Sequence, residues 1–186
     1  MPPIDINFLS LLKDDYKKYH TFIETGTYWG QTTFVMEPLF KQIYTVEIKP
    51  EFYNNVKNNY KGNKINFLLG DSSDVFKTLL PTITSPSIFF LDGHWSAGDT
   101  GRGVKDCPLF EELQVIHDTF VPNAILIIDD CRIFGKGPKY NNEICNWEDI
   151  SIPGVINILG NRIDKTYFLD SSHAKNDRMI VHLNSK

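Results

Sequence analysis

The stretch TFIETGTYWGQTT, residues 21–33, joins a strand, a glycine-containing turn and the start of a helix. Its apolar beginning predicts a strand that ends in Glu24, and Gly26 and Gly30 follow in the turn. Glycines let the backbone approach a bound ligand, and the N-terminus of the next helix offers unpaired N–H groups. The stretch therefore predicts a ligand site between a strand and a helix, with a turn that binds nothing as the alternative.

The position of Glu24 limits which ligand this turn could bind. A carboxylate at the strand end would repel a phosphate, whereas it suits a cationic group or hydroxyls. S-adenosylmethionine carries an ammonium, a sulphonium and a ribose, so the turn favours this cofactor over a dinucleotide. A nicotinamide-dependent oxidoreductase fits less well for a second reason, because the turn lacks the Gly-x-Gly-x-x-Gly spacing.

The composition of the chain is that of one folded domain. Its 186 residues are 41% hydrophobic and 23% charged, which is enough for a core of ordinary size. We expect a single domain over residues 1–186, with an N-terminal helical segment at 1–20 and an α/β core at 21–186.

Charge and cysteine content argue against several functions. The net charge is −4 and no long basic run is present, so a nucleic acid is not expected as the main partner. Three scattered cysteines suit reduced thiols, and predict a cytoplasmic protein, or one of the host cytoplasm if it is viral. We expect no secretory leader and no membrane span, since no run approaches the ~20 apolar residues required. The sequence leaves the oligomeric state open.

Strands and helices alternate five times along the chain. Five predicted strands are apolar throughout and lie at 21–24, 42–48, 65–70, 87–91 and 124–128. Predicted helices lie at 5–19, 29–37, 50–60, 75–80, 108–120 and 147–159, the last kinked or split by Pro153. Two final strands, near 167–169 and 179–183, form a hairpin-like ending. Uniformly apolar strands that alternate with helices indicate an α/β fold whose parallel sheet is covered on both faces.

Acidic residues stand at the ends of all five of these strands. The six acids are Glu24, Glu47, Asp71, Asp92, Asp129 and Asp130. Ligands of open α/β sheets bind at the carboxyl ends of the strands, so these side chains predict one acidic rim around a site.

The first three acids of this rim are candidates for holding the cofactor. Glu47 lies where an acid grips ribose hydroxyls in nucleotide-binding folds, or it could interact with the dipole of the helix that begins at Pro50. Asp71 could accept a hydrogen bond from an adenine amino group, or cap its own helix. The predicted cofactor residues are Glu24, Thr25, Gly26, Thr27, Gly30, Thr32, Glu47, Asp71, Ser72 and Asp92.

Asp92, Asp129 and Asp130 form a second predicted group, because the fourth and fifth strands are neighbours in this architecture. Three carboxylates without cations repel each other and are costly to bury. Magnesium or manganese would balance them, since both ions prefer oxygen ligands and keep open water positions. The alternative is that Asp129 or Asp130 caps the next loop and no metal binds.

Residues near the ends of the first and fourth strands are candidates for contacting an acceptor. His94 could take a proton near neutral pH, or merely hydrogen-bond to the backbone. Residues 96–106 predict a mobile substrate loop with Arg102 as its contact, or a solvated connector. Tyr28, Trp29 and Trp95 could form a flat apolar wall for a sugar or an aromatic acceptor, or Trp29 could pack against its own helix.

Over about residues 21–183 the chain resembles class I S-adenosylmethionine-dependent methyltransferases. The resemblance rests on five motifs in the order found in that family: ETGTYWG, VEIKPE, GDSSD, FFLDGHW and IIDD. The resemblance implies a Rossmann-like, doubly wound sheet of seven strands, mostly parallel with one antiparallel strand near the C-terminus. It also implies S-adenosylmethionine as the cofactor. These motifs say little about the acceptor.

Within this class, Asp92 with Asp129 and Asp130 resembles the metal site of magnesium-dependent O-methyltransferases, of the macrocin sugar type and the catechol type. His94 is placed like the base of the sugar enzymes. The run LDGHWSAGDTGRGVKDCPLFEEL resembles methyltransferase domains of surface-glycan biosynthesis, including those of algal viruses. The resemblance thus implies an O-methyltransferase that uses Mg²⁺ or Mn²⁺ and methylates a sugar hydroxyl of a glycan, with His94 and Asp92 as catalytic residues.

The chain is shorter than the macrocin type and has little room for a substrate domain, so we expect an open site that could take a large glycan. Other interpretations stay open on the sequence alone. The chain could methylate a catechol-like aromatic or a protein, or it could be a non-catalytic domain that binds S-adenosylmethionine.

Overall fold

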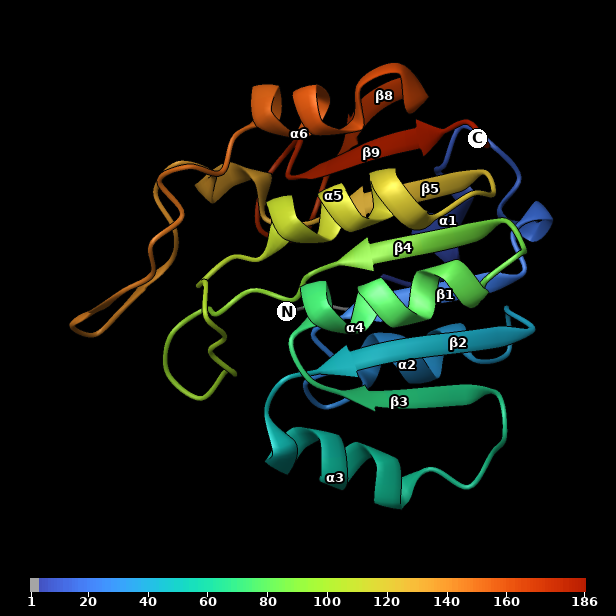
Figure 1. Cartoon of the computed structure of the whole chain (residues 1–186). Coiled ribbons are helices and arrows are strands. Elements are labelled where there is room, and N and C mark those ends of the chain that lie inside the picture. The colour runs from blue at the N-terminus through green and yellow to red at the C-terminus, as the bar shows by residue number, and fades with distance from the viewer. Residues whose placement is uncertain (1–3) are drawn as a thin grey trace.

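Seven strands form one sheet in the order β3-β2-β1-β4-β5-β9-β8 in the computed structural model, which describes residues 4–186 (Figure 1). Residues 1–3 of the expected segment 1–20 lie outside the described residues. The strands are β1 (Thr21–Thr25), β2 (Gln42–Glu47), β3 (Ile65–Leu69), β4 (Ser87–Leu91), β5 (Ala124–Ile128), β8 (Ile163–Leu169) and β9 (Arg178–Leu183). β9 runs antiparallel to its neighbours β5 and β8, and the other pairs are parallel. The predicted mostly parallel sheet with one late antiparallel strand is confirmed.

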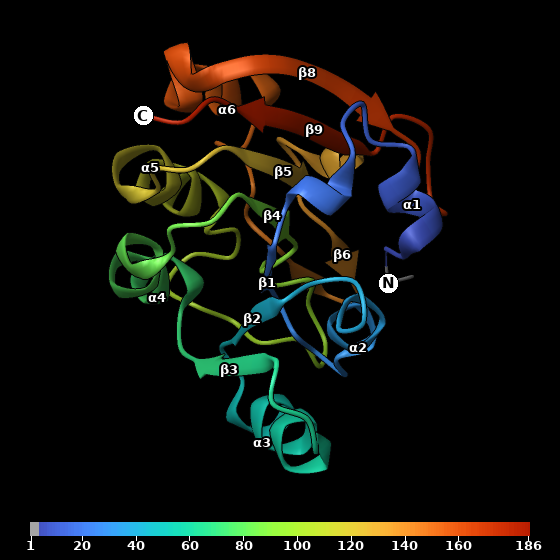
Figure 2. The ribbon, with the colours of Figure 1, turned by 90° about the vertical axis from the view of Figure 1, so that its right-hand side faces the viewer.

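Helices cover both faces of this sheet, as its apolar strands require. They are α1 (Ile6–Ser10), α2 (Gln31–Met36), α3 (Pro50–Asn59), α4 (Ser72–Leu79), α5 (Leu109–Thr119) and α6 (Ile152–Leu159). Figure 2 shows α4, α5 and α6 on one face and α1 and α2 on the other, with α3 beside the edge strand β3. Within residues 4–186, none of the helices combines the length and the apolar character that crossing a bilayer demands.

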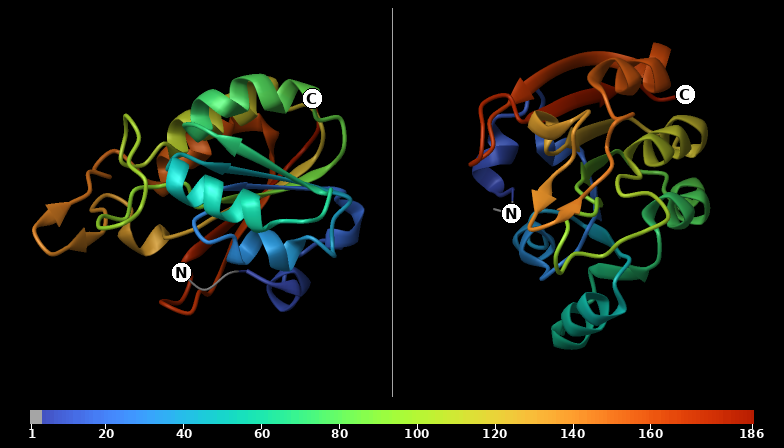
Figure 3. Two further views of the ribbon diagram at one scale, coloured as in Figure 1. Left: turned by 90° about the horizontal axis from the view of Figure 1, so that it is seen from below. Right: turned by 90° about the vertical axis from the view of Figure 1, so that its left-hand side faces the viewer.

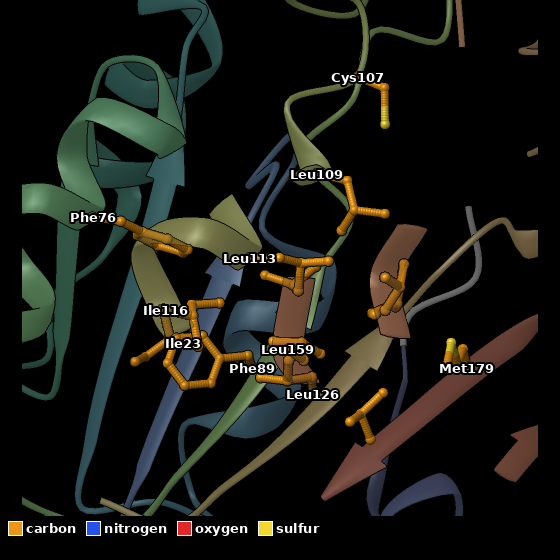
Figure 4. Close-up of a cluster of buried hydrophobic side chains, with 14 of the residues drawn as sticks. Ile23, Phe76, Phe89, Cys107, Leu109, Leu113, Ile116, Leu126, Leu159 and Met179 are labelled. Carbon is orange, nitrogen blue, oxygen red and sulfur yellow. The ribbon is translucent and has the colours of Figure 1, made fainter. Parts of the chain in front are cut away.

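The larger of two hydrophobic cores lies between the sheet and helices α4, α5 and α6. Figure 4 shows Phe76 of α4, Leu113 and Ile116 of α5, Phe89 of β4 and Leu159 of α6 in this core. All five side chains are fully buried. Burying one such side chain contributes about 1.5–3 kcal/mol, so this core holds α5 firmly against the strands whose ends carry the candidate site.

The helix predicted at 5–19 is wrong in its length. Only Ile6–Ser10 is α-helical, and the side chain of Asp5 caps its start. A second aspartate, Asp15, caps a separate 3-10 turn at Tyr16–Lys18. Because aspartate side chains compete for backbone N–H groups, this second cap interrupts the pattern that one continuous helix would need.

The helix predicted at 147–159 begins later than expected. α6 starts at Ile152, after Ser151, whose hydroxyl accepts a hydrogen bond from the N–H of Gly154. Pro153 lies in the first turn, where its missing N–H costs no helical hydrogen bond. The proline therefore marks the start of the helix and does not kink it.

Two connections extend beyond the carboxyl ends of the parallel strands. Residues 93–108 link β4 to α5, and a second connection carries the hairpin of β6 (Lys139–Tyr140) and β7 (Glu143–Ile144). Figure 3 shows both beyond the arrowheads of the sheet. Sequence analysis missed this hairpin, because two-residue strands give no periodic signal. Both connections lie where α/β folds bind their ligands.

Candidate active site

A pocket of about 240 Å³ opens at the carboxyl ends of the parallel strands. It is bounded by the turn after β1, the ends of β2 and β3, and residues of the loop after β4. The predicted site residues that line it are Gly26, Tyr28, Glu47, Asp71, Ser72, Asp92, His94 and Trp95. The pocket therefore brings predicted cofactor residues and predicted acceptor residues together.

Gly26 lets the turn after β1 lie directly against the turn after β4. Its φ of +83° suits glycine, and a Cβ atom there would lie 2.5 Å from the backbone oxygen of Asp92. Gly30 has a different role, since a Cβ atom on it would lie 2.7 Å from Cγ1 of Val56 in α3. The first glycine of the turn thus shapes the pocket, and the second packs the scaffold beneath it.

The remaining predicted cofactor residues are buried outside the pocket lining; they are Glu24, Thr25, Thr27, Gly30 and Thr32. Thr25 accepts a hydrogen bond from the N–H of Asp92 at 3.2 Å, and the hydroxyls of Thr27 and Thr45 share one at 2.6 Å. These contacts support the turn from below. A direct contact between these residues and the cofactor stays a prediction.

The Glu24 carboxylate turns into the protein. It is 2% exposed and accepts hydrogen bonds from the hydroxyls of Thr33 in α2 and Thr45 in β2, the latter at 2.8 Å. Burial raises the pKa of Glu24 to about 8, although these hydrogen bonds oppose the shift. Glu24 is therefore largely uncharged at pH 7, and the geometry gives no support to its predicted contact with a cationic ligand.

Glu47 and Asp71 stand on the pocket wall and also hold the backbone around it. Glu47 accepts hydrogen bonds from the N–H groups of Tyr28 and Lys49, at 2.8 and 2.9 Å. The first of these bonds fixes Tyr28, whose φ of +48° is uncommon for a residue other than glycine. Asp71 caps α4 by accepting from the N–H of Ser73 at 3.0 Å. Because a carboxylate has about four lone-pair positions, both acids can also accept hydrogen bonds from a ligand.

His94 lies between two carboxylates at the inner end of the pocket. Its Nε2 atom is 3.0 Å from Oδ1 of Asp92 and 3.2 Å from Oδ2 of Asp130, and its Nδ1 atom is 2.9 Å from Oγ of Ser96. Burial would lower the pKa of His94, but Asp130 and Asp92 outweigh it and raise that pKa to about 10. The imidazolium is therefore the resting form, and it balances the two carboxylates.

Arginines balance the other acids of the predicted metal group. Nε of Arg178 lies 3.2 Å from Oδ1 of Asp129, and Arg132 forms an ion pair with Asp130. Burial opposes ionisation of Asp130, but His94 and Arg132 outweigh it and lower its pKa to about 2. These carboxylates therefore already have cationic partners in the fold, and a metal ion at this site stays a prediction. The two arginines come from η3 (Cys131–Ile133) and the start of β9, which the sequence analysis did not connect with the acids.

Two groups of side chains place ligand atoms within 4.8 Å of one another: Asp92, His94 and Asp130, and Asp129, Asp130 and Asp177. The predicted triad is divided between them. In the second group, Arg132 and Arg178 already supply positive charge. In the first, Oδ1 of Asp92 and Nε2 of His94 are buried without an aligned hydrogen-bond partner among residues 4–186. Oxygen and nitrogen donors of this kind fit a small divalent cation.

The predicted acceptor residues separate into two groups. Tyr28 and Trp95 line the pocket, whereas Arg102 does not. Arg102 donates from Nε to Asp106 at 2.7 Å, and its guanidinium lies 4.0 Å from the centre of the Trp95 ring. It therefore orders the loop after β4. The cation of this loop that lines the pocket is Lys105, and nothing in the sequence distinguished the two.

No protein-family model and no curated protein sequence matches the chain. The fold resembles solved structures at low sequence identity. A protein described as an O-methyltransferase from Klebsiella pneumoniae has a TM-score of 0.64 and 14% identity, over 98% of this chain and 82% of that one. The O-methyltransferase TomG from Streptomyces achromogenes, involved in tomaymycin synthesis and solved with S-adenosylmethionine, has a TM-score of 0.61 and 12% identity, over 91% and 75%.

The acceptor atom varies among these similar structures. The N-methyltransferase NodS from Bradyrhizobium japonicum WM9 has a TM-score of 0.53 and 12% identity, over 90% of this chain and 86% of that one. Likenesses of this degree establish architecture and leave the reaction to be argued from the site. The chain has the seven-stranded methyltransferase fold that these O- and N-methyltransferases share.

Proposed function

We propose that the chain is an S-adenosylmethionine-dependent O-methyltransferase that methylates a sugar hydroxyl of a glycan or glycoconjugate. The observation that carries the proposal is the arrangement of acids around one pocket. Glu47 ends β2 and Asp71 follows β3, whereas Asp92 and His94 follow β4, so the two pairs lie on opposite sides of β1 in the sheet. This provides a cofactor site and a proton-accepting group side by side, which hydroxyl methylation needs.

The cofactor residues that we propose are those on the pocket wall. Glu47 accepts hydrogen bonds from the ribose hydroxyls, and Asp71 accepts one from the adenine amino group. Gly26 lines the same wall, and the methionine part lies along its backbone. The apolar side chain of Ile48 also lines this pocket and offers a surface to the adenine ring. The solved complex of TomG with S-adenosylmethionine, on the same fold, supports this cofactor.

His94 is the base in the proposed reaction. The acceptor oxygen attacks the methyl carbon as the bond from that carbon to the sulphonium sulphur breaks, which leaves S-adenosylhomocysteine. The hydroxyl proton moves to Nε2 of His94, and the carboxylates of Asp92 and Asp130, within 3.2 Å of this atom, stabilise the resulting imidazolium. Because the imidazolium is the resting form, His94 must first release its own Nε2 proton to solvent, and the neutral imidazole then accepts the proton of the hydroxyl.

We also propose that Asp92, Asp129 and Asp130 hold Mg²⁺ or Mn²⁺ during turnover. Two buried carboxylate oxygens that have no aligned hydrogen-bond partner among residues 4–186, Oδ1 of Asp92 and Oδ2 of Asp129, suit such an ion. When bound, it would lower the pKa of the acceptor hydroxyl. His94 competes with this role, because Nε2 already lies between Asp92 and Asp130. The chain thus has two means of balancing these acids, the imidazolium and a metal ion.

The sugar acceptor is supported by the aromatic part of the wall. Tyr28 is 39% exposed beside the pocket, and Trp95 lines it more deeply. An aromatic face can pack against the apolar face of a sugar ring while the hydroxyls at its edge point toward His94. Lys105 and Tyr28 border the same pocket, so a large glycan could extend from it across the loop after β4.

The test is methyl transfer from radiolabelled S-adenosylmethionine to a panel of mono- and oligosaccharides, with catechol and a protein mixture as competing acceptors. We expect label in a saccharide and, if the metal proposal is right, loss of transfer with EDTA that Mg²⁺ restores. His94→Ala should lower turnover by about 10²–10⁴-fold. Label only in catechol or protein would contradict the sugar assignment. Near-normal turnover of His94→Ala would show that His94 is not the base.

A further inference from the structure

Glu112 is a carboxylic acid on the apolar side of α5. It is 1% exposed, and Leu109, Leu113 and Ile116 of the same helix are buried in the larger core (Figure 4). Burying a carboxyl group is costly, and a leucine would fill this position without that cost. Burial raises the pKa of Glu112 to about 7. The reaction proposed above does not use this group, so its contacts must give it another role.

The Glu112 carboxylate contacts three segments that frame the pocket. The hydroxyl of Ser72, at the start of α4, donates a hydrogen bond to Oε1. Thr25, the last residue of β1, also hydrogen-bonds to Glu112, and it accepts the N–H of Asp92 at 3.2 Å. Gly93 lies so close that a Cβ atom on it would be 3.2 Å from Oε1. One buried side chain thus joins the ends of β1, β3 and β4.

No hydrogen bond of the sheet joins β3 directly to β4. Two strands, β2 and β1, separate them in the sheet. Asp71-Ser72 follows β3 and Asp92-Gly93 follows β4, and all four residues line the pocket. Any change in the distance between these two turns would move the proposed adenine side of the pocket relative to the methyl side.

We infer that Glu112 is a positioning residue for cofactor binding. It acts through its hydrogen bonds to Ser72 and to Thr25, whose hydroxyl accepts the N–H of Asp92, and so holds the two turns at the separation that S-adenosylmethionine requires. The inference rests on the proposed function for the identity of the ligand. The geometric part stands by itself, because these hydrogen bonds join the two turns whichever ligand the pocket binds.

The test compares Glu112→Leu, Glu112→Gln and a matched core variant, Ile116→Ala, on the same side of α5. Calorimetric titration with S-adenosylhomocysteine gives the dissociation constant of each protein. Leucine keeps the volume and loses the acceptor, so we expect at least a tenfold weaker affinity. Glutamine keeps an acceptor oxygen for Ser72 and should bind within about threefold of the wild type. Ile116→Ala should lower the unfolding temperature and leave the affinity unchanged below it.

Hydrogen exchange provides a readout that needs no ligand. Peptides that cover residues 70–74 and 91–95 should exchange faster in Glu112→Leu than in the wild type, and not in Ile116→Ala. Wild-type affinity and wild-type exchange in Glu112→Leu would overturn the inference. An equal loss of affinity in Glu112→Gln and Glu112→Leu would also overturn it. A wild-type protein that does not bind S-adenosylhomocysteine, with faster exchange in Glu112→Leu, would contradict the proposed cofactor and leave the positioning role supported.

Discussion

Replacing Glu24 with glutamine should stabilise the protein, and the gain should grow with pH. Glu24 is buried under the turn after β1, and its two hydrogen bonds come from the hydroxyls of Thr33 and Thr45. Glutamine has nearly the same shape and an oxygen that can accept these bonds, but it carries no charge. The variant therefore removes the cost of ionising this buried group and little else.

The size of the effect follows from the pKa of Glu24, which is about 8 in the fold and 4.5 in the free group. Between these values the unfolded chain loses the proton and the folded chain keeps it. The free energy of unfolding of the wild type is therefore highest, as far as Glu24 is concerned, below about pH 4.5, and it falls as the pH rises toward 8. At 1.36 kcal/mol for each pKa unit, the wild type should be less stable than Glu24→Gln by roughly 4 kcal/mol at pH 8, and by about 1 kcal/mol at pH 5.

Urea unfolding at pH 5, 6, 7 and 8 measures this difference. Glu148→Gln is the matched control, because Glu148 is exposed and its replacement should give a small difference that does not change with pH. A difference between Glu24→Gln and the wild type that is constant from pH 5 to 8 would refute the reasoning. It would mean that Glu24 ionises in the folded protein as it does in the unfolded chain.

Two further predictions concern the scaffold. Gly26→Ala should destabilise the fold by about 2–4 kcal/mol, because its methyl group would meet the backbone oxygen of Asp92. The control is Gly135→Ala, which should cost about 1 kcal/mol, since Gly135 has a φ of +77° and open space around it. Equal losses of unfolding free energy in urea would contradict this prediction. Arg162→Met should cost about 3 kcal/mol, because this buried guanidinium donates to carbonyl oxygens at the end of α5, before β5 and after β9. Calorimetry should find unchanged affinity for S-adenosylhomocysteine, and a weakened affinity would contradict a purely structural role.

The sheet could be predicted from the sequence because its signal is local. Ile125 and Ile127 face one core and Leu126 faces the other, so β5 is apolar at every position and must be covered on both faces. The acids after such strands must then gather at one edge. This reasoning placed Glu47, Asp71 and Asp92 correctly on one pocket.

The direction in which a side chain points, and its partners from distant segments, could not be predicted in the same way. Glu24 is the next-to-last residue of β1 and Glu47 is the last of β2, but the Glu24 side chain points into the protein, where it accepts hydrogen bonds from the hydroxyls of Thr33 and Thr45. Arg178 reaches Asp129 from a strand 49 residues later in the chain, and no pattern joins the two in sequence. Glu112 carried a signal that was overlooked, since it is a charged residue on the apolar side of its helix.

Thermal unfolding with S-adenosylhomocysteine, with NAD as the control ligand, tests the central claim most directly. A ligand at ~100 times its dissociation constant adds about 2.7 kcal/mol of stability, which gives a clear shift in unfolding temperature. We expect a shift with S-adenosylhomocysteine that is lost in Glu47→Ala, and none with NAD. A shift with NAD and none with S-adenosylhomocysteine would contradict the proposed cofactor and the interpretation of the glycine turn after β1.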